Sequence, residues 1–271
     1  MSKYVQGQGG PGENPLIDDA INQKFLRQVA IRKLRNPVLK ADVERLVRLQ
    51  YDCLGIASDT IPDIGPEAQQ REGAFAKGER ANVLEYAGEP MEIPHKRVNA
   101  GKGDWVGFIR FNRTGFFDPA VLGKALEDRS IGKQVVWDDL ISRGFPRDFA
   151  SASDLFHDPQ DRPAGMLLYV SVLPKLRGLG LVDKALSSAI NDLRGDGADF
   201  AVAYARLPEL ESAANNADNA RRKLDEYVAM RNPEGWSPDW GVRFHQRAGG
   251  TLICGIPDSA PDDARSLGRE R

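Results

Sequence analysis

Residues 170–186 read VSVLPKLRGLGLVDKAL, and this stretch decides the interpretation of the whole chain. An apolar run ends at Pro174, and a basic turn with Gly178 and Gly180 then opens an amphipathic helix. Glycine tolerates positive φ and lets a ligand approach the backbone, while the first turn of a helix presents N–H groups without intrahelical partners. The pattern therefore predicts a strand, a tight turn and a helix whose N-terminus can bind phosphate.

Two other phosphate-binding turns do not fit this sequence. The P-loop ends in Gly-Lys-Ser/Thr, and the dinucleotide fingerprint requires a third glycine and an acidic residue after the next strand. CoA is then the natural phosphate ligand, and Arg177 adds a positive charge that could reach its phosphates. A strand-to-helix loop whose glycines serve only a tight geometry remains the alternative.

Hydrophobic periodicity predicts further elements on both sides of the turn. A strand at 165–173 leads into it and a helix at 182–193 follows, with Val182, Leu186, Ile190 and Leu193 facing inward. The other predicted strands cover 29–34, 105–111, 200–205 and 251–256, and the other helices cover 18–27, 40–54, 210–230 and 239–248. The helix at 40–54 should bury Val43, Leu46, Val47, Leu49 and Leu54.

Two segments lack a clear period. Residues 55–102 are assigned to loops with one short helix near 66–77. Residues 114–164 form a polar insertion with short helices near 120–126 and 137–141. A loop-rich segment of this length usually covers something.

Composition excludes several classes of protein. The 37 basic and 39 acidic side chains nearly cancel, so there is no electrostatic basis for non-specific nucleic-acid binding. No apolar run reaches the roughly 18 to 20 residues of a membrane span. Cys53 and Cys254 form no metal or disulfide pattern, and neither His95 nor His157 has metal-ligand spacing. We expect a cytoplasmic protein without a metal, nucleic-acid partner or membrane contact.

The turn resembles the cofactor site of the GNAT acyltransferases, which has the form V-x-P-x-x-R-G-x-G-x-G/A followed by a helix with a leucine near its second turn. Val182 departs from this form, which usually has Gly or Ala there. The matching residues are Val172, Pro174, Arg177, Gly178, Gly180 and Leu186. The resemblance implies an α/β (α+β) fold, with a mixed, mostly antiparallel central sheet flanked by helices and long insertions. It also implies one domain at 28–271. Before it, residues 1–15 have too little apolar content to pack, and the apolar spacing in 18–27 predicts a short helix, so 1–27 is expected to be a tail with a short helix.

The helix at 239–248 is a second match to the same family. GNAT members commonly carry A-x-x-F-Y-x-x-x-G-F there, and residues 242–250 resemble a variant with His245 at the tyrosine position. A subgroup associated with carbon-nitrogen hydrolases instead has Asp-Pro-x-x-x-x-His, then Gly-Ala and a proline-containing strand. The segment 239–257 is similar to that version, which fixes no substrate.

The resemblance implies direct transfer of an acetyl group from acetyl-CoA to an amine, without a covalent enzyme intermediate. A backbone N–H near Val172 would stabilise the oxyanion. Residues implied to bind the cofactor are Val170, Val172, Arg177, Gly178, Leu179, Gly180, Leu181 and Val182. Another acyl-CoA could replace acetyl-CoA as the co-substrate.

Five further residues are candidates for catalysis and substrate binding. His245 is the candidate acid, because imidazole exchanges a proton near neutral pH. Tyr204 and Glu209 are candidates for the base or a water relay, and Tyr169 and Arg206 for contacts with the substrate. Each of them also fits a purely structural role.

Three functions therefore stay open. The first is an N-acyltransferase acting on the amine of a small molecule. The second is an acyl-thioester enzyme that decarboxylates a malonyl group or transfers acyl groups to a carrier protein. The third is a CoA-binding module without catalysis. Exposed sheet edges would also allow a homodimer.

Overall fold

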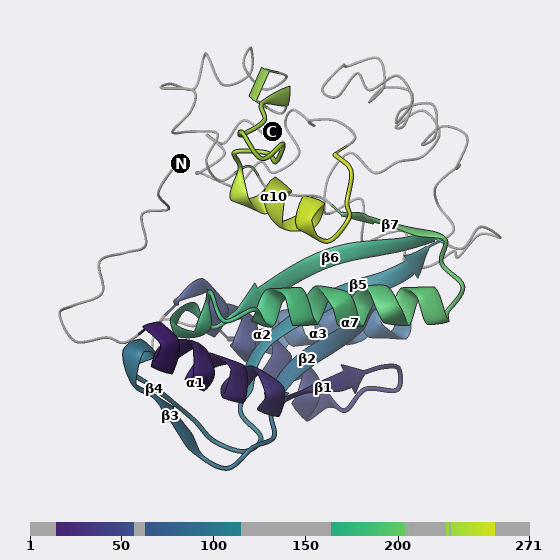
Figure 1. Cartoon of the computed structure of the whole chain (residues 1–271). Coiled ribbons are helices and arrows are strands. Elements are labelled where there is room, and N and C mark those ends of the chain that lie inside the picture. Colours follow the sequence, from purple (N-terminus) through teal and green to yellow (C-terminus); the bar gives the residue numbers. More distant parts are fainter. Residues whose placement is uncertain are drawn as a thin grey trace. The chain divides into compact units, whose positions relative to one another are not determined.

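The structure is a computed structural model, which describes residues 15–56, 63–114, 164–203, 207, 226–227 and 229–252. Five strands form one sheet in the order β1-β2-β5-β6-β7, and a separate hairpin pairs β3 with β4 (Figure 1). The sheet strands are β1 (Val29–Leu34), β2 (Arg80–Tyr86), β5 (Trp105–Thr114), β6 (Ala164–Val172) and β7 (Phe200–Ala203). The hairpin consists of β3 (Met91–Ile93) and β4 (Val98–Ala100).

The helices flank this mostly antiparallel, open sheet, as the sequence resemblance implied. Two short 3-10 turns also occur, one in the β3–β4 hairpin and one directly after β6. The helices are α1 (Pro15–Gln28), α2 (Lys40–Leu54), α3 (Gly65–Ala76), α7 (Leu181–Gly195) and α10 (Trp240–Arg247), and the 3-10 turns are η1 (Pro94–Lys96) and η3 (Pro174–Leu176). The predicted α/β (α+β) fold is confirmed.

Internal contacts divide the chain into two compact units. The first unit contains the described residues up to Gly73, Arg80–Arg110 and Tyr169–Ser188. The second contains Ala74–Glu79 and the described residues within 111–168 and from Ala189 onward. β5, β6 and α7 each contribute one end to each unit. The turn after β6 belongs to the first.

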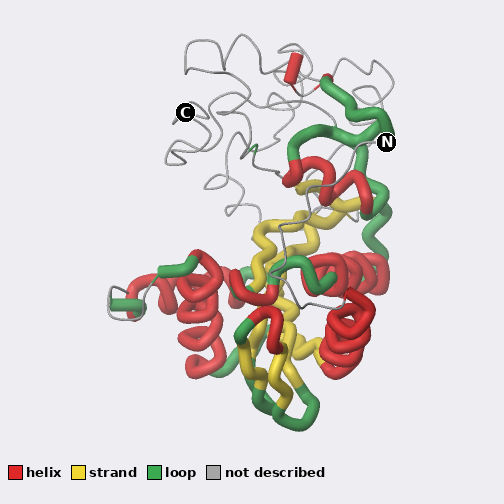
Figure 2. The backbone as a smooth tube through the Cα atoms, turned by 60° about the vertical axis from the view of Figure 1, so that its left-hand side comes forward, coloured by secondary structure: helices red, strands yellow, loops and turns green. Residues whose placement is uncertain are grey.

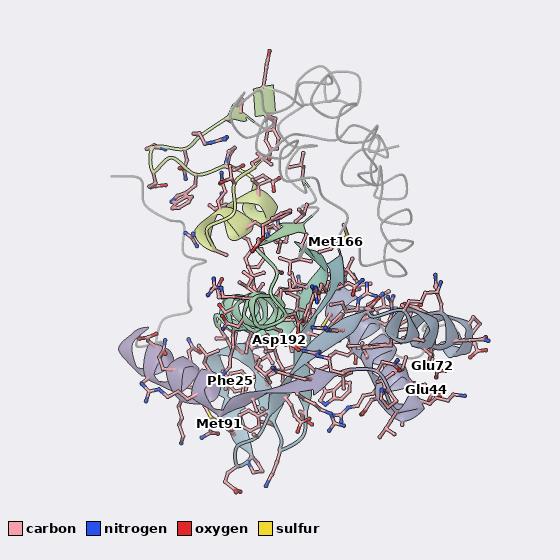
Figure 3. All side chains as sticks on the ribbon, turned by 90° about the vertical axis from the view of Figure 1, so that its right-hand side faces the viewer. Phe25, Glu44, Glu72, Met91, Met166 and Asp192 are labelled. Atoms are coloured by element: carbon pink, nitrogen blue, oxygen red, sulfur yellow. The ribbon has the colours of Figure 1, made fainter. Side chains whose placement is uncertain are left out.

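The core of the first unit forms around β1 and β2, which pair antiparallel from Val29↔Tyr86 to Leu34↔Ala81. The Phe25 ring of α1 stacks on Tyr86 with 5.3 Å between the ring centroids, and both side chains are fully buried (Figure 3 labels Phe25). α1 is thereby fixed to the sheet through aromatic packing.

α2 has the predicted bounds but not quite the predicted inner face. Val43, Leu46, Val47 and Leu49 are buried as expected. Leu54, however, is 53% exposed, and Cys53 is the buried residue at that end of the helix. Cys53 lies two turns after Leu46, on the same face, whereas Leu54 is rotated by about 100° from Cys53.

The prediction of loops for 55–102 is wrong for β2 and for the β3–β4 hairpin, while its short helix is confirmed as α3. β2 lies inside the sheet and buries residues on both faces, so its sequence RANVLEY shows no alternation. The side-chain amide of Asn82, which is fully buried in β2, has hydrogen-bond partners on neighbouring elements. The side-chain oxygen accepts from Arg35 at 3.0 Å, and the amide donates to the Ser188 hydroxyl at 3.0 Å.

The second unit contains the parallel pair of β6 and β7, in register from Ala164↔Phe200 to Leu167↔Ala203. Gly165 allows α7 to pack closely on β6, since a Cβ there would lie 2.5 Å from Cδ1 of Leu193. Figure 3 labels Met166 on β6 and Asp192 on α7.

α10 starts where the sequence predicted, because Asp239 is its N-cap. The carboxylate accepts from the Gly241 N–H at 2.9 Å, and its other oxygen accepts from the Tyr227 hydroxyl at 3.0 Å. Asp239 is fully buried, so these two donors provide the hydrogen bonds that water would give an exposed carboxylate.

Several sequence predictions lie outside the described residues. They include the helices at 120–126 and 137–141, most of the helix at 210–230, the last two residues of the strand predicted at 200–205, and most of the strand predicted at 251–256. Thr251 and Leu252 are described and are not in a strand. Within the described ranges, no helix is both long and apolar enough to cross a bilayer.

Candidate cofactor-binding site

The turn after β6 has the backbone geometry that the sequence predicts. Gly178 and Gly180 adopt positive φ values of 85° and 78°, and α7 begins at Leu181. The Lys184 N–H donates to the Gly180 carbonyl at 3.1 Å, so the N–H groups of residues 181–183 precede the helix's own bonding pattern. This arrangement can bind an anion, because those N–H groups and the helix dipole both favour negative charge.

Buried leucines hold the turn in place. Leu176, Leu179 and Leu181 are 1%, 5% and 1% exposed, whereas Arg177 and Gly178 between them are exposed. The side chains of the three leucines therefore anchor the turn in the core. Leu179 and Leu181, predicted as cofactor contacts, could contribute only main-chain atoms.

The C-terminal end of α2 supports the turn through Arg177. An Nη atom of Arg177 donates to the carbonyl oxygen of Cys53 at 2.8 Å. The Cys53 thiol is fully buried and hydrogen-bonds Ser171, the residue before the last one of β6. Burial raises the pKa of this thiol to about 12. Arg177 thus stabilises a helix end, a role that the sequence did not suggest.

The C-terminal end of α1 supports the turn from another element. Lys184 Nζ donates to the Leu26 carbonyl at 3.0 Å, and a Cβ on Gly180 would lie 3.5 Å from Cδ2 of Leu26. Burial lowers the pKa of Lys184. Neither Leu26 nor Lys184 was a site candidate, because only their positions in the fold connect them to the turn.

Gly107 on β5 approaches β6 just before the turn. A Cβ at Gly107 would lie 2.6 Å from Cγ1 of Val172 and 2.8 Å from the Ser171 carbonyl oxygen. The Leu173 N–H donates to the Val106 carbonyl at 3.0 Å. Val172 is 2% exposed, so its side chain belongs to the core, while Val170 is half-buried. The oxyanion donor near Val172 stays a prediction.

Tyr169, a predicted substrate contact, lies on β6 and packs against β5. Its ring stacks on Phe108 with 5.5 Å between centroids, and the Arg110 guanidinium lies 5.5 Å from the Tyr169 ring centroid. Arg110 itself is only 6% exposed. These contacts give Tyr169 a packing role, and its contact with substrate is still a prediction.

His245 belongs to the second unit, where it lies in the last turn of α10. Its ring packs against Phe244 with 4.8 Å between centroids, and its carbonyl accepts from the Gly250 N–H at 2.9 Å. Burial lowers the pKa of His245 to about 4, so the ring is neutral near pH 7. A neutral imidazole can accept a proton, but it is a weak direct acid.

Other sequence candidates lie beyond what the structure describes. They are Tyr204, Arg206 and Glu209, together with Cys254 and His157. The side chain of His95 is also outside the description. Their predicted roles therefore remain predictions.

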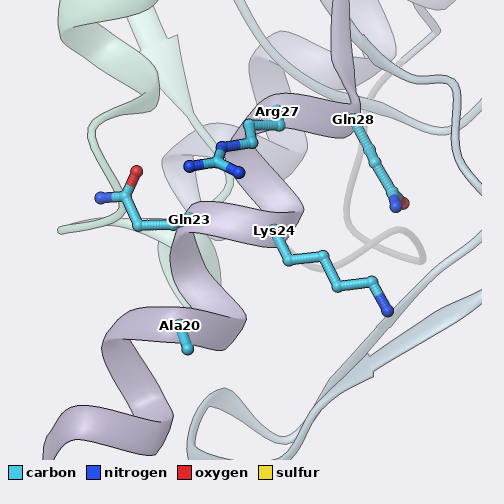
Figure 4. Close-up of a pocket in the computed structure, with 5 residues that line it drawn as sticks. All are labelled: Ala20, Gln23, Lys24, Arg27 and Gln28. Atoms are coloured by element: carbon cyan, nitrogen blue, oxygen red, sulfur yellow. The ribbon is translucent and has the colours of Figure 1, made fainter.

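A shallow hollow of about 440 Å³ lies along the exposed side of α1 (Figure 4). Among the described residues it is lined by Ala20, Gln23, Lys24, Arg27 and Gln28. Except for the partly buried Gln28, these residues are exposed, so the hollow has no enclosed binding surface. No cluster of three or more metal-ligating side chains occurs within the described part of the chain.

No protein-family model matches the sequence, and no curated protein is significantly similar to it. The loading GNATL domain of CurA from Lyngbya majuscula is a structural neighbour, with a TM-score of 0.54 and 19% identity, covering 89% of this chain and 93% of that one. A malonyl-CoA decarboxylase from Rhodopseudomonas palustris has a TM-score of 0.48 and 12% identity, covering 94% of this chain and 56% of that one. A ribosomal-protein-alanine N-acetyltransferase from Brucella melitensis has a TM-score of 0.35 and 13% identity, covering 75% and 94%. The similarity to the CurA domain, together with the turn between β6 and α7, shows that this chain has the GNAT fold.

Proposed function

We propose that the chain binds an acyl-CoA at the turn between β6 and α7 and transfers the acyl group to an amine of a small molecule. The observation that carries the proposal is the pair of positive φ values at Gly178 and Gly180, immediately before the N-terminus of α7. Phosphate oxygens could approach this backbone without meeting a side chain at either glycine.

The transfer requires one bond to form and one to break. The amine nitrogen attacks the thioester carbonyl carbon, a C–N bond forms, and the C–S bond breaks with its electron pair remaining on sulfur. The amine proton ends on the departing thiolate. Acetyl-CoA is the proposed donor, and the products are an amide and free CoA.

The low pKa of His245 changes the role that we propose for this residue. A ring that is neutral near pH 7 has a nitrogen lone pair that can accept the proton of the attacking amine, but the burial that keeps the ring neutral also makes it a weaker base than an exposed imidazole. Because burial disfavours the imidazolium, the ring would then release this proton readily to the thiolate. His245 is therefore a proposed proton shuttle rather than a simple acid, with Tyr204 or Glu209 as further proposed participants.

Titration calorimetry with CoA, acetyl-CoA and malonyl-CoA tests the proposal on the wild-type protein and on Gly180→Glu. The variant adds a carboxylate where the anion would bind and places a side chain at φ 78°, which costs roughly 1–2 kcal/mol. Saturable binding that the variant loses would support the site. Absence of binding by all three ligands would refute it.

Turnover assays with the same thioesters separate the alternative functions. Release of CO₂ from malonyl-CoA without an acceptor amine would favour decarboxylation. Binding of CoA without turnover of either thioester, in the presence of a panel of amines and an acyl carrier protein, would favour a non-catalytic module. Gly195→Glu is a matched control, because Gly195 ends α7 and a Cβ there would meet no atom within 4 Å.

A further inference from the structure

A lysine from the β3–β4 hairpin reaches the glycine turn, although its surrounding sequence shows no recognisable pattern. Lys96 is the last residue of η1, and its Nζ donates to the Arg177 carbonyl at 3.1 Å. The same Nζ lies 4.0 Å from the position that a Cβ on Gly178 would occupy. A positive charge is thus placed at the first glycine of the turn.

The hairpin that carries Lys96 is a well-formed element. β3 and β4 pair antiparallel from Met91↔Ala100 to Ile93↔Val98, and Ile93 is fully buried. Figure 2 shows this hairpin as two strands closed by a helical turn. Arg97 follows Lys96 with a left-handed φ of 50°, and its N–H donates to the Pro94 carbonyl at 3.0 Å. The tip conformation is therefore defined by its own hydrogen bonds.

The neighbouring arginine is engaged elsewhere. The Arg177 guanidinium donates to the Cys53 carbonyl at 2.8 Å, at the end of α2. A carbonyl oxygen carries a partial negative charge and would repel a phosphate bound beside it. The hydrogen bond from the Lys96 ammonium offsets this partial charge on the Arg177 carbonyl oxygen. An ammonium group has three N–H donors, and the contact with Arg177 uses one of them.

We propose that Lys96 is a phosphate-binding and positioning residue of the CoA site. It holds the Arg177 carbonyl and pairs with a phosphate of CoA, which gives the turn the charge that the sequence assigned to Arg177. This inference rests on the proposed function, because it requires CoA at the turn. It makes the β3–β4 hairpin part of the cofactor site.

The test compares three variants of the full chain by titration with CoA at low salt and at about 0.5 M NaCl. Lys96→Met removes the charge and keeps an unbranched side chain, and Lys96→Arg keeps the charge. Lys102→Met is the control, since Lys102 is an exposed lysine in the turn after β4. We expect Lys96→Met to weaken CoA binding about tenfold at low salt and by less at high salt. Lys96→Arg should recover most of the affinity, and Lys102→Met should not change it.

The salt dependence distinguishes a charge contact from a loss of structure. A purely structural role of Lys96 would weaken binding equally at both salt concentrations, and that result would overturn the inference. Equal affinity of Lys96→Met and wild type would also overturn it. If wild type binds CoA and Gly180→Glu does not, that result would leave the proposed function standing. If wild type does not bind CoA, both proposals fail.

Discussion

Replacing Gly107 with alanine should destabilise the first unit, because β5 and β6 meet there without room for a side chain. The added Cβ would lie 2.6 Å from Cγ1 of Val172 and 2.8 Å from the Ser171 carbonyl oxygen. Carbon atoms in contact are normally about 3.5–4.0 Å apart, so the strands would have to separate by almost 1 Å. Overpacking of this kind costs about 1–3 kcal/mol. The hydrogen bond from Leu173 to Val106 would weaken as well.

The assay is equilibrium unfolding in urea, with Gly73→Ala as the matched control. Gly73 lies in α3, and a Cβ there would meet no atom within 4 Å. Alanine inside a helix is favoured over glycine by about 0.5–1 kcal/mol, so the control should be slightly more stable than wild type. Gly107→Ala should lower the free energy of unfolding by about 2 kcal/mol without changing the m-value. A Gly107→Ala protein as stable as wild type would refute the close approach of β5 and β6.

Three further predictions concern single side chains. Arg177→Met should lower the free energy of unfolding by about 1 kcal/mol, measured by urea unfolding, because the buried Cys53 carbonyl loses a charged donor; no loss would contradict the helix-end role. Iodoacetamide should not modify Cys53 in the folded protein, since burial raises the pKa of its thiol to about 12, and peptide mapping should detect modification only under unfolding conditions. Burial lowers the pKa of His245 from 6.5 to about 4, so between these pH values the unfolded chain binds a proton that the folded chain does not. The free energy of unfolding should therefore decrease as pH falls through this range, by at most about 3 kcal/mol. If His245→Gln unfolds with the same pH dependence as wild type, that result would contradict the lowered pKa of His245.

The sequence predicted the elements with a regular pattern or a recognisable turn. β1, α2 and α7 have apolar spacings that predicted their secondary structure, and α10 has a buried aspartate at its N-cap. In α7, Leu186 and Leu193 are buried as expected, but Val182 and Ile190 are only partly buried, and Leu181, Ala185 and Ala189 complete the inner face. The glycine turn could be located because the required positive φ values favour glycine. These are local properties of the chain, which a single sequence can reveal.

The sequence did not predict features that depend on distant parts of the chain. β2 was missed because it is buried on both faces and contains Asn82, which becomes acceptable only when Arg35 and Ser188 provide its hydrogen bonds. Lys96 was missed because a contact over 81 residues leaves no local signal. The sequence predicted that Arg177 would contact phosphate, but it gave no sign that the Cys53 carbonyl at the end of α2 would bind the guanidinium instead.

The most direct test of the central claim is an NMR titration of the isotope-labelled protein with CoA, following the backbone amides of residues 178–183. We predict that these amides shift together and saturate with CoA, because their N–H groups would bind its phosphates. The amides of the exposed residues of α3 serve as an internal reference, because their chemical shifts should not change. Saturable shifts located elsewhere, with the amides of 178–183 unchanged, would contradict the assignment of this turn as the cofactor site.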